Sequence, residues 1–145
     1  MDSLWGVWNN TNQEDTIRLK AMHKIAWYGY LFSKPDSAFY CAQLMYEMAN
    51  ENGLIKYKAI SLNVIGVYYF YKGNYEKAIE SYEKSIKFYE ESGYQRGKAN
   101  ALGNIANVFV NQANYPKAIK FYLQREAYSK MAKLPNHGRF LKLIL

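Results

Sequence analysis

The chain is poor in cysteine, proline and long apolar runs, and each scarcity excludes a class of protein. A single cysteine, Cys41, cannot form an intramolecular disulfide or a zinc cage built from thiolates. No apolar run approaches the roughly 18 residues that a membrane-spanning helix needs, so we expect no membrane span. The first residues contain neither a basic segment nor an apolar core, so no signal peptide is visible. The sequence favours a cytoplasmic location, with the periplasm as the alternative if a leader was removed.

Aromatic residues are abundant instead. The 145 residues include 15 tyrosines, 7 phenylalanines and 3 tryptophans, and 50% of the chain is hydrophobic. This composition excludes intrinsic disorder and supplies a single domain with a buried core. The net charge of +7 is concentrated near the C-terminus, where residues 96–145 hold nine Lys or Arg against Glu126 alone. This asymmetry favours an acidic partner, with nucleic acid or a plain solvated helix face as alternatives.

The sequence repeats itself with a period of 40 residues. Small residues form two columns at this spacing, which are Ala26, Gly66 and Ala106, and Ala38, Ala78 and Ala118. Residues 59–98 and 99–138 are also identical at several positions, namely Ala59, Leu62, Ile65, Asn74, Tyr75, Lys77, Ala78, Ile79 and Tyr82 with their equivalents. Self-similarity at such a period indicates an array of supersecondary units stacked side by side. The small columns are expected to let the paired helices of each unit approach closely.

Each repeat predicts two antiparallel helices. In the second repeat Leu62, Ile65 and Tyr69 share one helical face, and Gly73 with Asn74 supplies a helix end followed by an N-cap. The predicted helices cover residues 14–32, 36–51, 54–72, 75–91, 94–111 and 115–131. We therefore predict an all-α solenoid, an alpha-alpha superhelix of about three helical hairpins over residues 16–53, 54–93 and 94–133.

The two ends of the chain are expected to cover this stack. Trp5 and Trp8 are predicted to fold over the first unit. Residues 134–145 are predicted to form a partial fourth-unit helix or a cap over the third. Because the last seven residues, Arg139 to Leu145, are largely apolar, we expect a homo-oligomer formed through the C-terminal edge.

The repeat resembles the tetratricopeptide repeat (TPR). The run Leu62-x-x-Ile65-Gly66-x-x-Tyr69 followed by Ala78-x-x-x-Tyr82 is similar to its W-x-x-L-G-x-x-Y and A-x-x-x-F signature, with Leu in place of Trp. The period of 40 departs from the usual 34. Such extended repeats resemble bacterial sensor regions that precede cyclase or histidine-kinase domains. The resemblance implies a non-enzymatic scaffold or sensor module for signalling, which binds a protein or peptide segment and needs no cofactor.

The resemblance also implies a concave groove lined by the first helix of each unit. Asparagine is a poor helix former, yet four asparagines follow one stripe of the third such helix. Each carboxamide offers one acceptor and two donors to a peptide backbone, while a polar solvent face or bonds between repeats is the alternative. The expected binding residues are Asn63, Phe70, Asn100, Asn104, Asn107, Asn111, Trp27 and Tyr30. His23, Val67 and Tyr71 project to the same face.

No catalytic or metal-binding constellation is visible in the sequence. The two histidines, His23 and His137, lie in different units without a carboxylate or cysteine cluster at metal spacing. Cys41 lies among apolar residues and is expected to be a small core residue. We therefore expect no enzyme and no metal site. Two rival functions remain, a basic helical protein that binds nucleic acid and a structural segment of a larger signalling protein, although scattered basic residues weaken the first.

Overall fold

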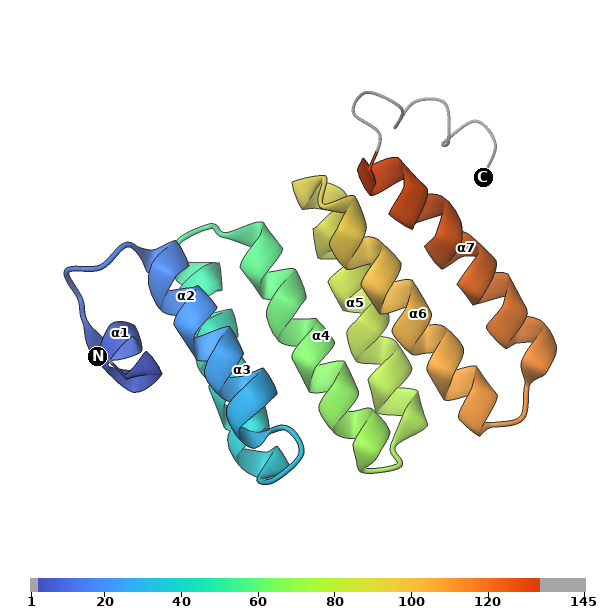
Figure 1. Cartoon of the computed structure of the whole chain (residues 1–145), viewed down its shortest axis with the longest axis horizontal. Helices are drawn as coiled ribbons and strands as arrows, with labels where there is room; N and C mark the ends of the chain where they lie inside the picture. Colours follow the sequence, from blue (N-terminus) through green and yellow to red (C-terminus); the bar gives the residue numbers. More distant parts are fainter. Residues whose placement is uncertain (1–2, 134–145) are drawn as a thin grey trace.

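The computed structural model describes residues 3–133, and within them every regular element is a helix (Figure 1). The elements in chain order are α1 (Leu4–Asn9), α2 (Asp15–Lys24), the π-helical η1 (Ile25–Tyr30), α3 (Pro35–Glu51), α4 (Ile55–Tyr71), α5 (Tyr75–Ser92), α6 (Gln95–Asn111) and α7 (Tyr115–Lys133). The predicted all-α helical solenoid is therefore confirmed. None of the described helices is long and apolar enough to cross a membrane.

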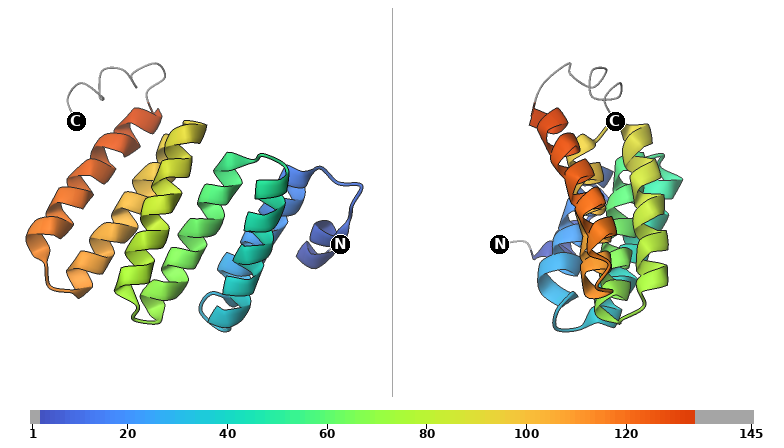
Figure 2. Two further views of the ribbon diagram at one scale, coloured as in Figure 1. Left: turned by 180° about the vertical axis from the view of Figure 1, so that it is seen from behind. Right: turned by 90° about the vertical axis from the view of Figure 1, so that its right-hand side faces the viewer.

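The helices of the first two hairpins alternate between two layers, and α7 stands beside α6 at the end of the array (Figures 1 and 2). We call α2 with η1, α4 and α6 the front helices, and α3, α5 and α7 the back helices. Each helix packs against its neighbour in the chain, and the front helices also contact one another from α2 to α4 and from α4 to α6. The array is therefore open along its length, and the front helices of all three hairpins share one face.

The turns within the second and third hairpins use equivalent residues. Gly73 adopts the left-handed conformation at φ 77°, and its equivalent Ala113 does so at φ 57°. Asn74 then caps α5, because its Oδ1 atom accepts a hydrogen bond from the Lys77 amide at 3.2 Å. The turn chemistry predicted from Gly73 and Asn74 is confirmed. A residue with a Cβ atom at position 113 holds the same turn at a cost of about 1–2 kcal/mol.

The first front helix, predicted over 14–32, is helical from Asp15 to Tyr30, but it changes from α-helical to π-helical after Lys24. The segment Ile25–Tyr30 is π-helical, and the Leu31 amide donates to the carbonyl of Ala26 at 2.9 Å. A π turn holds one additional residue per turn, so it rotates every later side chain relative to a regular helix. Leu31 is consequently buried, whereas its equivalent Tyr71 is 56% exposed.

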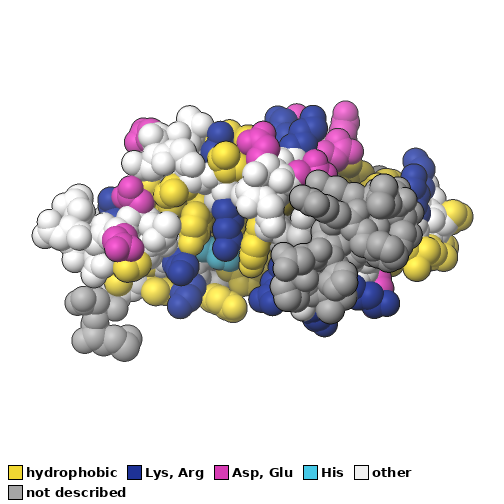
Figure 3. Space-filling view, turned by 90° about the horizontal axis from the view of Figure 1, so that it is seen from above, with side chains coloured by type: hydrophobic (Ala, Val, Ile, Leu, Met, Phe, Trp, Pro, Cys, Tyr) yellow, Lys and Arg dark blue, Asp and Glu magenta, His cyan; other side chains and the backbone are white. Residues whose placement is uncertain are grey.

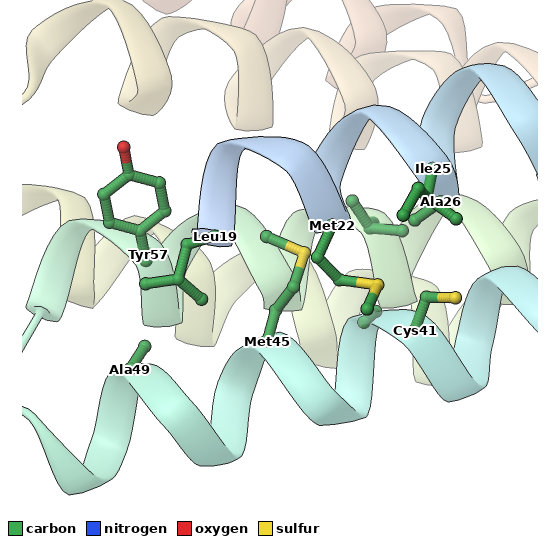
Figure 4. Packing of buried hydrophobic residues seen from close by; sticks show 10 residues of the cluster. Leu19, Met22, Ile25, Ala26, Cys41, Met45, Ala49 and Tyr57 are labelled. Atoms are coloured by element: carbon green, nitrogen blue, oxygen red, sulfur yellow. The ribbon is translucent and has the colours of Figure 1, made fainter. Parts of the chain in front are cut away.

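The core of the first hairpin lies between α2 and α3 (Figure 4). Leu19, Met22 and Met45 fill it, and Cys41 is a buried small residue as expected. Burial raises the pKa of the Cys41 thiol, which keeps it protonated at neutral pH. Apolar packing rather than thiol chemistry explains its place.

The helix α1 packs against α2 at the N-terminal end of the array. The Arg18 guanidinium donates to the Trp8 carbonyl at 2.7 Å and lies 5.4 Å from the centre of its ring. Trp8 therefore covers the first hairpin as expected, whereas Trp5 remains 38% exposed. At the other end, the cap expected over residues 134–145 lies outside the described residues, and so does most of the edge predicted to self-associate.

Candidate functional site

Two cavities open between the front helices. The upper cavity, near the starts of α4 and α6, has a volume of about 350 Å³. The lower cavity, near the ends of these helices, has a volume of about 170 Å³. The upper lining is His23, Lys24, Trp27, Tyr28, Ile60, Asn63, Tyr89, Tyr94, Gly97 and Asn100. The lower lining is Trp27, Phe32, Val67, Phe70, Tyr71, Tyr82, Asn104 and Asn107.

Trp27 and an asparagine pair join the two cavities into one groove. Trp27 belongs to η1 and lines both cavities. Asn63 of α4 lines the upper cavity, Asn104 of α6 lines the lower one, and Nδ2 of Asn104 donates to Oδ1 of Asn63 at 2.9 Å. Both asparagines are half-buried. The front face of all three hairpins therefore contributes to a single groove with a carboxamide pair at its middle.

Six of the eight expected binding residues lie in this groove. Asn63 and Asn100 line the upper cavity, Phe70, Asn104 and Asn107 line the lower cavity, and Trp27 lines both. The other two lie elsewhere. The Nδ2 atom of Asn111 donates to the Tyr75 hydroxyl at 3.4 Å, and Tyr30 packs half-buried against the core clusters because the π turn rotates it.

The asparagine stripe of α6 serves two purposes. Asn104 pairs with a neighbouring front helix, and Asn107 accepts a hydrogen bond from the hydroxyl of Tyr122 on α7. Asn100 is exposed at the rim of the upper cavity. Bonds between repeats, the alternative reading of this stripe, therefore account for part of it. These bonds also fix the direction in which the carboxamides face the groove.

Five aromatic lining residues were not predicted from the sequence as groove residues: Tyr28, Phe32, Tyr82, Tyr89 and Tyr94. Tyr28 and Phe32 are 82% and 69% exposed. Tyr28 lies within the π turn and Phe32 just after it, and the sequence shows no periodic signal for this turn. Tyr89 reaches the front face from the back helix α5, since Gly97 leaves room for its ring. A Cβ atom at Gly97 would lie 2.2 Å from Cε1 of Tyr89. The sequence signal that could have predicted this contact is the pair of a glycine, Gly97, and a large aromatic residue, Tyr89, on neighbouring helices.

The charge of the groove lies at its upper cavity, where Lys24 is the basic lining residue. Among the described residues, no Asp or Glu lines either cavity. The front helices contain one acidic residue, Asp15, which lies 3.8 Å from Arg18. Their basic residues are Arg18, Lys20, Lys24, Lys56, Lys58, Arg96 and Lys98. Lys58 lies over the rings of Tyr46 and Phe88 on the back helices, and Lys98 pairs with Glu90 of α5. The basic character of the groove is therefore confined to its upper cavity, because the lower cavity has no charged lining residue.

The upper cavity holds the titratable groups of the groove. Burial lowers the pKa of His23, so its imidazole is neutral at pH 7. Lys24 lines the same cavity, and the ammonium of Lys56 lies 3.9 Å from the ring centre of Tyr94. Figure 3 shows basic and hydrophobic side chains together around the histidine. Within residues 3–133, no group of three His, Cys, Asp or Glu side chains could hold a metal ion.

Comparison with known proteins identifies the family. A tetratricopeptide repeat family model matches residues 57–130, which are the second and third hairpins. The chain belongs to the tetratricopeptide repeat family. The crystal structure of the TPR domain of Arabidopsis FLU has the same fold, with a TM-score of 0.69 at 19% sequence identity, over 81% of this chain and 99% of that one. No curated protein matches the sequence. TPR domains are typically non-catalytic protein–protein interaction modules, and the fold indicates such a role here.

Proposed function

We propose that this TPR protein is a non-enzymatic module whose front groove binds an extended segment of another protein, as a scaffold or as the sensor region of a signalling protein. The observation that supports the proposal is the pair of half-buried carboxamides at the middle of the groove. Asn63 and Asn104 come from different hairpins, so the pair exists only in the assembled array. The groove therefore belongs to the stack rather than to one repeat.

The pair is chemically complementary to a peptide backbone. Asn63 uses its carbonyl oxygen and Asn104 uses its amide nitrogen in their mutual bond. The amide of Asn63 and the carbonyl of Asn104 then remain to face a ligand, one as donor and one as acceptor. If both amide groups were turned around, the two roles would exchange and the pair would still present one of each. A peptide unit offers the matching acceptor and donor.

The flanking cavities supply contacts for the side chains of the bound segment. Aromatic rings line both cavities, and aromatic side chains are common energetic centres of protein interfaces. A ligand held by backbone bonds at the Asn63–Asn104 pair would place neighbouring side chains into the cavities above and below. Trp27 contacts both positions. This arrangement suits an extended segment better than a compact small molecule.

Panning a phage-displayed library of random twelve-residue peptides against the immobilised protein tests the proposal. We expect it to select peptides whose affinity falls about fivefold or more in the variant Asn104→Ala, because a hydrogen bond to the backbone is lost. Asn50→Ala on the back helix α3 is the matched control, since Asn50 is exposed and lines neither cavity. If selected peptides bound both variants and the parent protein equally, with helicity unchanged, the groove would not be the binding site.

A further inference from the structure

We infer that the groove recognises two side chains of its bound segment, an acidic one in the upper cavity and a bulky apolar one in the lower cavity, about four residues apart. This inference rests on the proposed function and adds the chemistry of the partner. It goes beyond backbone recognition, because the two cavities differ in charge and in the exposure of their walls. The partner would be an extended acidic and apolar segment with a defined spacing.

The upper cavity favours an acidic side chain. Lys24 and His23 line it, and Asn63 and Asn100 add hydrogen-bonding groups. Lys56 adds a nearby cation, because its ammonium lies over the ring of the lining residue Tyr94. Among the described lining residues there is no carboxylate, so a buried Asp or Glu of the ligand would meet only cationic and neutral groups.

The lower cavity favours a bulky apolar side chain. Apart from two asparagines, its lining consists of Val67 and five aromatic residues, with no charged side chain among them. Phe32 and Tyr71 stand at its rim and pack edge to face with ring centres 5.4 Å apart. They are 69% and 56% exposed, so they lose a large solvent-accessible area when a ligand covers them.

The spacing follows from helix geometry. On α4 the upper cavity is lined by Ile60 and Asn63, and the lower one by Val67, Phe70 and Tyr71. The centres of these two groups are separated by about eight residues of helix, or roughly 12 Å at 1.5 Å per residue. An extended chain advances about 3.3 Å per residue and alternates its side chains between two faces, so two side chains about four positions apart point the same way and reach both cavities.

Panning the random library against charge-reversed and truncated variants tests the inference. The parent protein should select peptides that carry Asp or Glu about four residues from a bulky apolar residue. Lys24→Glu should lose the acidic preference and select Lys or Arg at that position, while the apolar preference remains. Lys87→Glu, on the exposed surface of α5 and outside both cavities, is the matched control and should select the same peptides as the parent.

A truncation of Phe32 tests the apolar preference of the lower cavity. Phe32→Ala should lose the apolar preference and keep the acidic one, whereas Tyr40→Ala, which removes an equally exposed ring from α3, should keep both. For the best selected peptide, replacing its acidic residue by the neutral amide should weaken binding to the parent about fivefold. Groove-dependent peptides without this residue pair would overturn the inference and leave the proposed function standing. The absence of any groove-dependent peptide would overturn the proposed function itself.

Discussion

Replacing Gly66 by alanine tests the closest approach between a front helix and a back helix. A Cβ atom at Gly66 would lie 2.4 Å from Cε1 and 2.6 Å from Cδ1 of Tyr82. Carbon atoms in favourable contact are about 3.5–4.0 Å apart, so the ring would have to move by about 1 Å or more. Tyr82 is only 1% exposed and belongs to the second core cluster, so apart from the side that lines the lower cavity its ring has little space for such a shift.

The magnitude follows from two opposing effects. Overpacking a core typically costs about 1–3 kcal/mol, whereas alanine is favoured over glycine in a helix interior by about 1 kcal/mol. We therefore expect Gly66→Ala to lower the free energy of unfolding by up to about 2 kcal/mol. In a Tyr82→Ala background the ring is gone, so the same change should raise the free energy of unfolding by about 1 kcal/mol.

Urea unfolding followed by far-ultraviolet circular dichroism measures both effects. Gly103→Ala is the matched control in α6, because its Cβ atom would meet only the side chain of Arg125, with Cδ nearest at 2.8 Å, and this flexible side chain can move aside. We expect this variant to match or exceed the parent protein in stability. The reasoning would be refuted if Gly66→Ala were as stable as the parent, or if its effect were the same with and without the Tyr82 ring.

Two further substitutions test the turn and the groove. Ala113 adopts φ 57° where the equivalent residue is Gly73, so Ala113→Gly should raise the free energy of unfolding by about 1 kcal/mol in urea, and an unchanged or lower value would contradict the strain argument. Burial lowers the pKa of His23 from its ordinary 6.5, so just below that pH the unfolded chain binds more protons than the folded one, and stability should fall as the pH falls. Urea unfolding at several pH values should show this fall in the parent protein and a smaller fall in His23→Asn. An identical pH dependence in the two proteins would count against the burial of His23.

The sequence predicted the features of the fold that depend on local chemistry. The repeat spacing located the helices, and Gly73 with Asn74 marked the turn between two of them because a left-handed residue followed by an N-cap has few other uses. The π turn gave no such signal. It depends on how Trp27 and Leu31 pack against the second hairpin, and this packing exists only once the array has assembled.

Groove residues that share one helix could be predicted from their spacing in the sequence. Contacts between residues of different helices could not. The asparagine spacing placed Asn104 on the front face, but its bond to Asn63 depends on the neighbouring hairpin. Tyr89 lines the groove because a large and a small residue are interchanged relative to the equivalent positions of the preceding repeats. Position 97 of the third unit holds glycine where the second unit has Tyr57, and position 89 of the second unit holds tyrosine where the first unit has Ala49. Only the three-dimensional pairing of these positions explains the exchange.

Mapping the amide shifts of the isotopically labelled protein while a selected peptide is added tests the central claim most directly. The account predicts that the shifts change along α2, η1, α4 and α6, with the side-chain amides of Asn63 and Asn104 among the largest. Changes confined to the back helices α3, α5 and α7, with the two side-chain amides unmoved, would contradict it.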